Sequence, residues 1–299
     1  MAMNLPHLGE IAALGTASCW TLTAIAFESA GRRIGSLVVN FVRLLIAAVF
    51  LSAFNGLTRG HVFPDDASSH AWLWLALSGF AGFNFGDLCL FRAFVVLGSR
   101  LSVLVMSLVP PITATIGFLF LGERLRPLDL GGMALTVMGI AWVVRNRRAS
   151  PEEKKHHHVK GELLALGGAL GQAVGLVLSK HGMGDYAPFA AVQIRVYAGI
   201  VGFALIFSAS GWWPRFWKGL GDARALTWTT LGAFFGPFLG VSLSLVAVQR
   251  TEAGVAATLM ALTPVFILVP SRVLQGDRVT WASVAGAALA VAGSALLFF

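Results

Sequence analysis

The ionisable side chains of Asp87, Arg43 and Arg195 lie inside long apolar segments of this chain, where a charge is costly. Asp87 lies near the middle of the segment 71–97, beside Asn84. Arg43 and Arg195 lie inside two other apolar segments. Charged groups within apolar segments usually mark a functional site. Asp87 could take up a proton or bind a substrate amine, and the alternative is a structural ion pair or a hydrogen bond to a freed backbone carbonyl.

Arg43 and Arg195 each offer a planar guanidinium, which can bind a carboxylate through two parallel hydrogen bonds. Both lie about two turns from the end of their segments. A position so near the end also allows the side chain to reach the membrane surface or to pair with a neighbouring helix. Carboxylate binding is therefore one of two interpretations for these residues.

Other residues are candidates for the lining of a substrate cavity. Methionine and phenylalanine form soft apolar pockets that accept varied side chains, although most such residues face lipid or other helices. Proline bends a helix and frees carbonyl groups, which suits a gate or a static bend equally. The predicted lining consists of Trp20, Thr23, Asn84, Asp87, Met106, Gln172, Phe238 and Met260, and the predicted kinks are at Pro110 and Pro264.

Enzymatic chemistry has little support in the sequence. The motifs HExxH, GxSxG and G-x-x-x-x-G-K-[ST] do not occur, and the histidines lie near segment ends or between segments. Asp87 is the one aspartate well inside a segment, whereas a paired-aspartate protease needs two. The run His156–His158 is interpreted as part of a charged tether. The sequence thus predicts no catalytic residue, no metal site and no cofactor.

These candidates are positioned by segments suited to a membrane. Apolar residues make up 57% of the chain, charged residues only 12%, and the mean hydropathy is +0.77. A spanning helix needs about 20 mostly apolar residues. The sequence predicts an all-α integral membrane protein with ten spans, at 8–30, 36–54, 71–97, 99–121, 127–145, 160–180, 187–209, 225–249, 252–274 and 279–299.

The segments form two copies of one unit. Residues 8–145 and residues 160–299 are similar in sequence and form an internal repeat. A basic, polar linker at 146–159 joins the two copies. In the alignment of the two copies, Gly9-Glu10 matches Gly161-Glu162, Arg43 matches Arg195, and Trp20 matches Gln172. Five spans in each copy place the second copy upside down, an architecture of transporters with the substrate path between the repeats. Because one chain holds both repeats, we expect a functional monomer.

A motif repeated in both copies resembles a known family. Pro110 is followed by Gly122-Glu123-Arg124-Leu125, and Pro264 by Gly276-Asp277-Arg278-Val279. This pattern resembles the drug/metabolite transporter superfamily, in particular its EamA-type exporters of amino acids and other metabolites in bacteria, and it covers essentially the whole chain. The resemblance implies ten helices around a central cavity, export of small metabolites without ATP hydrolysis, and a place in the bacterial inner membrane.

The basic residues give a signal about topology. The net charge of +8 lies mostly between segments, so lipid and not nucleic acid is the expected partner. Five Lys and Arg residues lie on the side of both termini and fourteen on the other side. That bias places the termini outside the cell, whereas the resemblance implies cytoplasmic termini; both orientations remain open here.

We therefore expect a membrane transporter that exports small metabolites, chiefly amino acids and related hydrophobic or zwitterionic solutes, by alternating access. An antiporter for phosphorylated metabolites is the alternative within the same fold, and a membrane sensor, scaffold or intramembrane enzyme lies outside it. A phosphate site requires several cavity cations. Only Arg43, Arg92 and Arg195 lie within segments, which favours neutral or zwitterionic solutes.

Overall fold

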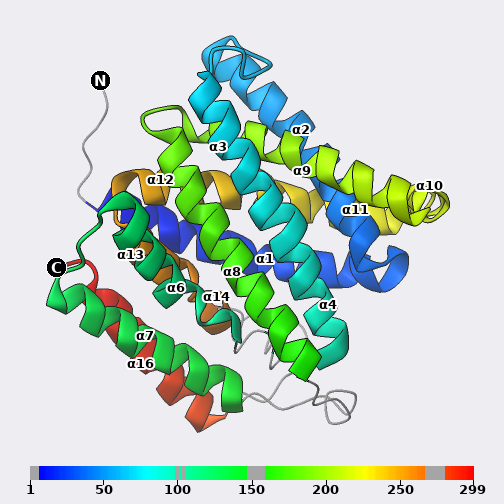
Figure 1. Ribbon diagram of the computed structural model, residues 1–299. Helices are drawn as coiled ribbons and strands as arrows, with labels where there is room; N and C mark the ends of the chain where they lie inside the picture. Colours follow the sequence, from blue (N-terminus) through cyan, green and yellow to red (C-terminus); the bar gives the residue numbers. More distant parts are fainter. Residues whose placement is uncertain (1–6, 98–101, 103–104, 147–158, 267–279) are drawn as a thin grey trace.

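The computed structural model describes residues 7–97, 102, 105–146, 159–266 and 280–299. All regular elements in these ranges are helices, which confirms the all-α prediction (Figure 1). The predicted linker residues 147–158, including His156–His158, and the motif Gly276-Asp277-Arg278-Val279 lie outside the described residues.

The first copy folds into long helices that match most of the predicted segments. These are α1 (Leu8–Ile34), α2 (Ser36–Arg59), α3 (Ser69–Gly79), η1 (Phe80–Gly86), α4 (Asp87–Leu97), α6 (Val109–Ile116), η2 (Gly117–Leu121) and α7 (Pro127–Asn146). The second copy comprises α8 (Val159–Met183), α9 (Pro188–Ser210), α10 (Trp213–Leu220), α11 (Ala223–Ala233), η4 (Phe234–Gly240), α12 (Val241–Arg250), α13 (Ala253–Met260), α14 (Thr263–Phe266) and α16 (Trp281–Leu296).

Seven helices in the described residues are long and apolar enough to cross a membrane. Three shorter apolar helices accompany them, at Val109–Leu121, Ala253–Phe266 and Trp281–Leu296. Two of these belong to the predicted spans 99–121 and 252–274, which lie partly outside the described residues. The chain is thus a multi-pass membrane protein, while the count of ten spans stays a prediction.

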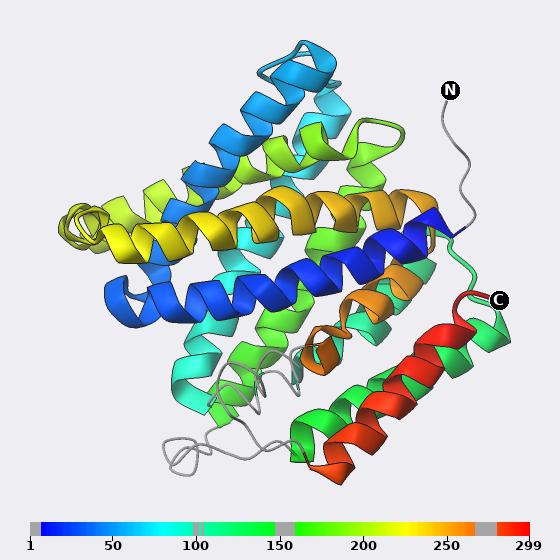
Figure 2. The ribbon, with the colours of Figure 1, turned by 180° about the vertical axis from the view of Figure 1, so that it is seen from behind.

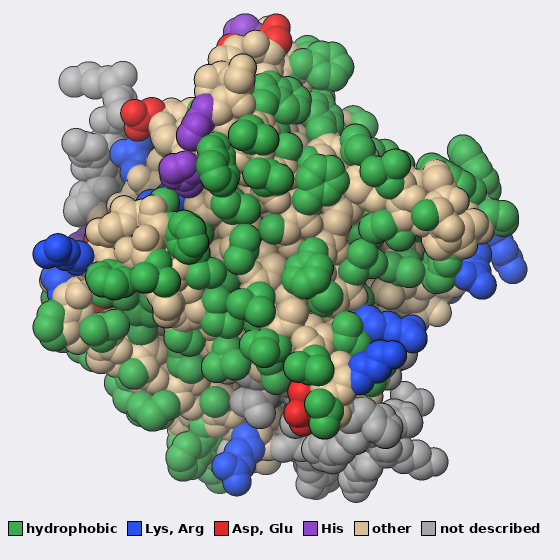
Figure 3. All heavy atoms as spheres, viewed as in Figure 1, with side chains coloured by type: hydrophobic (Ala, Val, Ile, Leu, Met, Phe, Trp, Pro, Cys, Tyr) green, Lys and Arg blue, Asp and Glu red, His purple; other side chains and the backbone are tan. Residues whose placement is uncertain are grey.

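The outer surface agrees with this placement. Large apolar side chains such as Leu57, Phe120 and Trp281 are mostly exposed. Figure 3 shows hydrophobic side chains over most of the visible face, with charged side chains gathered toward its margins. Such a surface is costly in water and suits contact with lipid.

The two copies pack with opposite orientation. At one end of α2, Phe41 contacts Phe203 and Phe207 of α9, and at the other end Asn55 donates a hydrogen bond to Gln193 of α9. Residue numbers therefore rise along one helix and fall along its repeat mate. The pairs α7–α16 and α6–α13 also pack together, and Figure 1 shows α7 and α16 side by side at the edge of the molecule. The first helix of each copy packs on the third span of the other (Figure 2).

The third and eighth predicted spans share an unusual interruption. α3 continues through η1 into α4, and α11 continues through η4 into α12. Both η1 and η4 are π-helical, and they occupy matching positions of the two copies. A π-helical turn inserts a residue into the α-helical register, changes which face the following side chains occupy, and is frequent at functional sites.

The predicted prolines lie where their helices are interrupted. Turn residues Ser107 and Leu108 precede α6, which holds Pro110 in its first turn. In the second copy, turn residues separate α13 from α14, which contains Pro264. The paired interruptions follow from the lost backbone donor of proline, and their part in gating stays a prediction.

The seam between α7 and α16 is built from glycine. A Cβ atom at Gly139 would lie 2.4 Å from the backbone nitrogen of Ala290, and one at Gly293 would lie 2.5 Å from that of Thr136. Small residues allow helix backbones to approach closely in lipid, where burial of apolar surface gives little driving force.

We expect Gly139→Ala to destabilise the protein, because the new methyl group forces two backbones apart at a cost of about 1–3 kcal/mol. Gly131→Ala on the same helix is the matched control, since nothing lies within 4 Å of a Cβ there. Thermal unfolding of both variants in detergent measures the difference. Equal unfolding temperatures would show that the seam is not tightly packed.

Candidate functional site

Asp87 lies in a buried ion pair with Arg43 of its own copy, and a hydrogen bond from Gln172 connects it to the second copy. It is the first residue of α4, immediately after η1, and only 7% of its surface is exposed. Its Oδ2 atom accepts a hydrogen bond from the Nη2 atom of Arg43, on α2. Its Oδ1 atom accepts a hydrogen bond of 2.9 Å from Nε2 of Gln172, on α8 of the second copy. Both carboxylate oxygens are therefore held by side chains from other helices.

Arg195, on α9 of the second copy, is a second buried arginine whose charge interacts with Asp87. Arg195 is 5% exposed, and its guanidinium carbon lies 5.2 Å from the centroid of the Phe83 ring in η1. The Arg195 and Asp87 charges interact electrostatically. α9 can approach η1 here because Gly79 and Gly82 have no side chain: a Cβ at Gly79 would lie 2.4 Å from the Arg195 carbonyl oxygen.

We call Arg43, Asp87, Gln172 and Arg195 the buried charged cluster. Arg43 is 9% exposed, and its guanidinium lies 5.3 Å from the ring centroid of Phe27. Arg43 and Arg195 each stand about two turns from the first residue of their helix. Because α2 and α9 are antiparallel, the two arginines belong to opposite ends of this helix pair.

The cluster is not electrically neutral. Two guanidinium groups face one carboxylate, which leaves one positive charge in the interior of the protein. The Nε atoms of both arginines are buried without a hydrogen-bond partner. A charge that is buried and incompletely paired costs several kcal/mol, so this arrangement is expensive to keep for stability alone.

Close packing of α8 on η1 positions Gln172. A Cβ at Gly171 would lie 2.6 Å from the Gly86 Cα atom, so the two backbones touch at this point. The Nε2 atom of Gln172 thereby reaches Asp87 and also lies 3.4 Å from the carbonyl oxygen of Gly82. The π-helical segment and a pair of glycines together place the amide beside the carboxylate.

The second copy repeats this scaffold without its charges. Trp20, the mate of Gln172, lies against η4, where a Cβ at Gly240 would be 3.0 Å from its Nε1 atom. The residue that follows η4 is Val241, at the position that Asp87 holds after η1. The polar cluster is therefore asymmetric, as expected from the sequence alignment of the two copies.

The remaining predicted lining residues do not join this cluster. Asn84 donates a hydrogen bond of 3.1 Å to the Gly199 carbonyl and so fastens η1 to α9, with its Oδ1 atom unpartnered. Thr23 is buried beside Gly236, and its hydroxyl donates to the Cys19 carbonyl. Phe238 belongs to an aromatic group with Phe50, Phe54 and Phe189. Met260 is buried and Met106 is half-buried.

A second polar group, which the sequence did not predict, lies on the side of the protein where α1 begins and α16 ends. The Lys180 Nζ atom lies 2.5 Å from Oε1 of Glu123 and donates a hydrogen bond of 2.6 Å to the Thr251 carbonyl. The other oxygen of Glu123 accepts a hydrogen bond of 2.9 Å from the backbone nitrogen of Ala253, at the start of α13. We call Glu123, Lys180 and Thr251 the terminal-side clasp, and it joins α8 to elements of both copies.

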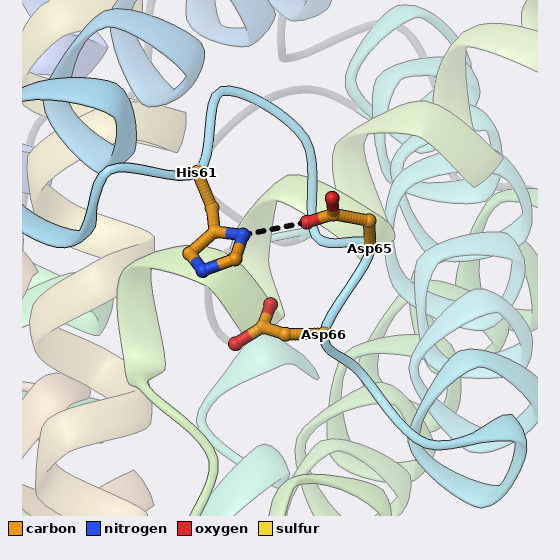
Figure 4. A group of neighbouring side chains, drawn as sticks. All are labelled: His61, Asp65 and Asp66. Carbon is orange, nitrogen blue, oxygen red and sulfur yellow. Dashed lines mark hydrogen bonds and ion pairs between the residues drawn. The ribbon is translucent and has the colours of Figure 1, made fainter.

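Polar residues also gather in the loop between α2 and α3 on that side. His61, Asp65 and Asp66 bring a nitrogen and carboxylate oxygens within 4.8 Å of one another, and His61 is hydrogen-bonded to Asp65 at 2.8 Å (Figure 4). Asp66 is paired with Arg59 and accepts a hydrogen bond of 2.7 Å from Tyr186. Partial burial raises the pKa of Asp66, but the Tyr186 hydrogen bond and the Arg59 charge outweigh it and hold that pKa below its usual value. These contacts tie the loop to the α8–α9 connection.

A shallow cavity of about 410 Å³ lies beside that loop. Its lining includes Asp66, His70, His181 and Tyr186, and the rings of His70 and His181 are 5.2 Å apart. Because Asp66 is already paired and the His61 group is exposed, the loop contacts account for both features. Neither calls for a bound ion.

Comparisons with known proteins agree with this architecture. A family model described as the EamA-like transporter family matches residues 7–145 and again residues 159–299. The chain is 44% identical over 48 residues to a probable terminal-alkyne amino-acid exporter of Streptantibioticus cattleyicolor, 16% of each chain. It is 28% identical over 193 residues to human solute carrier family 35 member G1, covering 62% of this chain and 51% of that one. The matches thus span about half of these relatives' length or less.

A solved crystal structure shares the fold. It superposes with a TM-score of 0.74 at 20% identity, covering 98% of this chain and 96% of the other. At this identity the likeness concerns the arrangement of helices and says nothing of the solute.

Proposed function

Because the chain belongs to the EamA-like transporter family, we propose that it moves small solutes across a bacterial inner membrane along the interface between its two copies. Amino acids and related hydrophobic or zwitterionic metabolites are the proposed cargo, and export is the proposed direction. Ten spans, alternating access and a functional monomer are parts of the same proposal.

The observation that carries the proposal is the buried charged cluster. Arg43 and Asp87 come from the first copy, and Gln172 and Arg195 from the second. Substrate sites of transporters built from inverted repeats lie near the middle of the bilayer, at the interface of the repeats. Ionisable groups inside a membrane usually belong to a solute or ion pathway. The cluster consists of ionisable groups within apolar helices at the interface of the two copies, and this supports the proposal.

Opposed movement of the two copies requires elements that bend, and several interruptions of the helices are suited to that. The π-helical segments η1 and η4 and the interruptions before Pro110 and Pro264 are matched between the copies. Short breaks and π-turns in a membrane helix concentrate bending at a few residues. We propose that these segments bend as the cavity opens to one side and then to the other.

Counterflow in proteoliposomes tests this function. Vesicles loaded with an unlabelled amino acid should accumulate the labelled one, and other amino acids should compete. Competition by sugar phosphates in place of amino acids would favour the alternative, an antiporter for phosphorylated metabolites. Absence of flux for every small metabolite, from either side, would exclude a transporter and favour a sensor or scaffold.

A further inference from the structure

Arg195 is a buried cation for which the described part of the chain provides no hydrogen-bonded counterion. Among the described residues, no carboxylate or carbonyl oxygen accepts a hydrogen bond from its guanidinium, and its contacts are the Phe83 ring and the charge of Asp87. The oxygens of Asp87 are already occupied by Arg43 and Gln172. A guanidinium has five donors in a fixed planar fork, so this one retains donors for a further acceptor.

Aromatic contact alone does not compensate the charge. A cation over a ring gains about 0.5–2 kcal/mol, whereas removing an ion from water costs several kcal/mol. The surplus charge of the cluster is one, because two guanidiniums face one carboxylate. A ligand that carries one negative charge at a planar, two-oxygen group would neutralise the cluster and match the fork of the guanidinium.

We propose that Arg195 binds the carboxylate of the transported solute, so that the protein selects monocarboxylates, amino acids among them. This inference rests on the proposed transport function and names the substrate class of the same site. Asp87 stays paired with Arg43 and Gln172 and holds the α2, η1 and α8 side of the subsite in place. A phosphate monoester, with close to two negative charges, would overcompensate the cluster and is expected to bind less well.

Comparison of the two copies explains why Arg195, and not Arg43, binds the carboxylate in this proposal. Its repeat mate Arg43 is about equally deep but is engaged by Asp87. The residue that follows η4 is Val241, so no corresponding carboxylate arises from the second copy. Duplication supplied two equivalent arginines, and one aspartate in η1–α4 leaves one of them for a ligand.

Paired ligands provide the test. In counterflow and in ligand-induced shifts of thermal unfolding, wild type should respond to an amino acid and to its desamino monocarboxylate. It should respond much less to the amino acid amide and to the decarboxylated amine. Arg195→Gln should lose about 10- to 100-fold in apparent affinity for the carboxylates, the usual worth of a charge-assisted hydrogen bond. Arg195→Lys keeps the charge but loses the planar pair of donors. Its apparent affinity for the carboxylates should lie between those of wild type and Arg195→Gln.

Arg92→Gln is the matched control, because Arg92 is also an arginine within an apolar span, on α4, but its side chain is exposed. It should behave as wild type. If Arg195→Gln unfolds at a much lower temperature, Arg195→Lys serves as the test variant. If wild type transports amides and amines as well as carboxylates, the proposed carboxylate subsite is wrong, while the proposed transport function stands. No flux of any solute would overturn both.

Discussion

Replacement of Asp87 by leucine should lower the stability of the protein by about 3–5 kcal/mol and abolish transport. The substitution leaves the Arg43 guanidinium buried without its counterion, which is the costly way to break a buried ion pair. The Gln172 amide loses its acceptor at the same time. Fluorescence-detected thermal unfolding in detergent measures the first effect, and counterflow measures the second.

The double variant Arg43→Met/Asp87→Leu separates a structural role from a functional one. Replacing both members of a buried pair by apolar residues of similar size is often neutral or stabilising. We therefore expect the double variant to regain most of the lost stability and to remain inactive, because the organised wall of the subsite is gone. A double variant with wild-type transport would show that the pair serves only to hold helices together.

A covalent link across the terminal-side clasp should stop transport reversibly. In the structure, Glu123 and Lys180 form a partly buried ion pair beside the start of α13, which connects α8 to the segment after η2. Movement of the copies against each other would have to break that pair. With Glu123→Cys and Lys180→Cys joined by a short bifunctional methanethiosulfonate reagent, flux should fall to the level of protein-free vesicles and recover after reduction.

The native thiols require a control in this experiment. Cys19 and Cys89 are free cysteines within the spans, and replacement of both by alanine should precede the introduced pair. Each single cysteine variant treated with the reagent should keep its flux, since no link can form. Full flux in the linked double variant would mean that transport does not require the clasp to open.

Much of the fold could be predicted from the sequence because hydrophobic length determines membrane helices so strongly. The predicted spans at 36–54, 71–97 and 187–209 correspond to α2, α3–α4 and α9 within a few residues. The short helix α10 was not predicted. Its aromatic residues and the proline in its first turn are the sequence signal that could have indicated it. In the structure, Arg215 lies 4.4 Å over the Trp212 ring.

The site could be predicted residue by residue but not as an assembly. Asp87 and Arg43 are recognisable in the sequence because charges in apolar segments are rare, and Gln172 because it aligns with Trp20. Their contact depends on the register that η1 imposes and on the close approach of α8 at Gly171. A π-helical turn has no distinct pattern in a single sequence, so the spacing of side chains beyond it could not be derived.

Several contacts that the sequence did not predict join residues distant in the chain. Phe27 and Phe83 lie under the two guanidiniums, but an isolated phenylalanine in an apolar chain carries no signal of such a contact. Glu123 follows Gly122, whose positive φ of 67° ends η2. That glycine-glutamate pair was visible as a motif, whereas the Lys180 partner of Glu123 became apparent only in the folded protein.

Counterflow of a labelled amino acid into proteoliposomes that contain only the purified protein is the most direct test of transport between the two copies. The account predicts accumulation above that of protein-free vesicles, abolished in Arg43→Met/Asp87→Leu and strongly reduced in Arg195→Gln. Vesicles that accumulate no amino acid or other small metabolite, although the protein is folded and inserted, would contradict it.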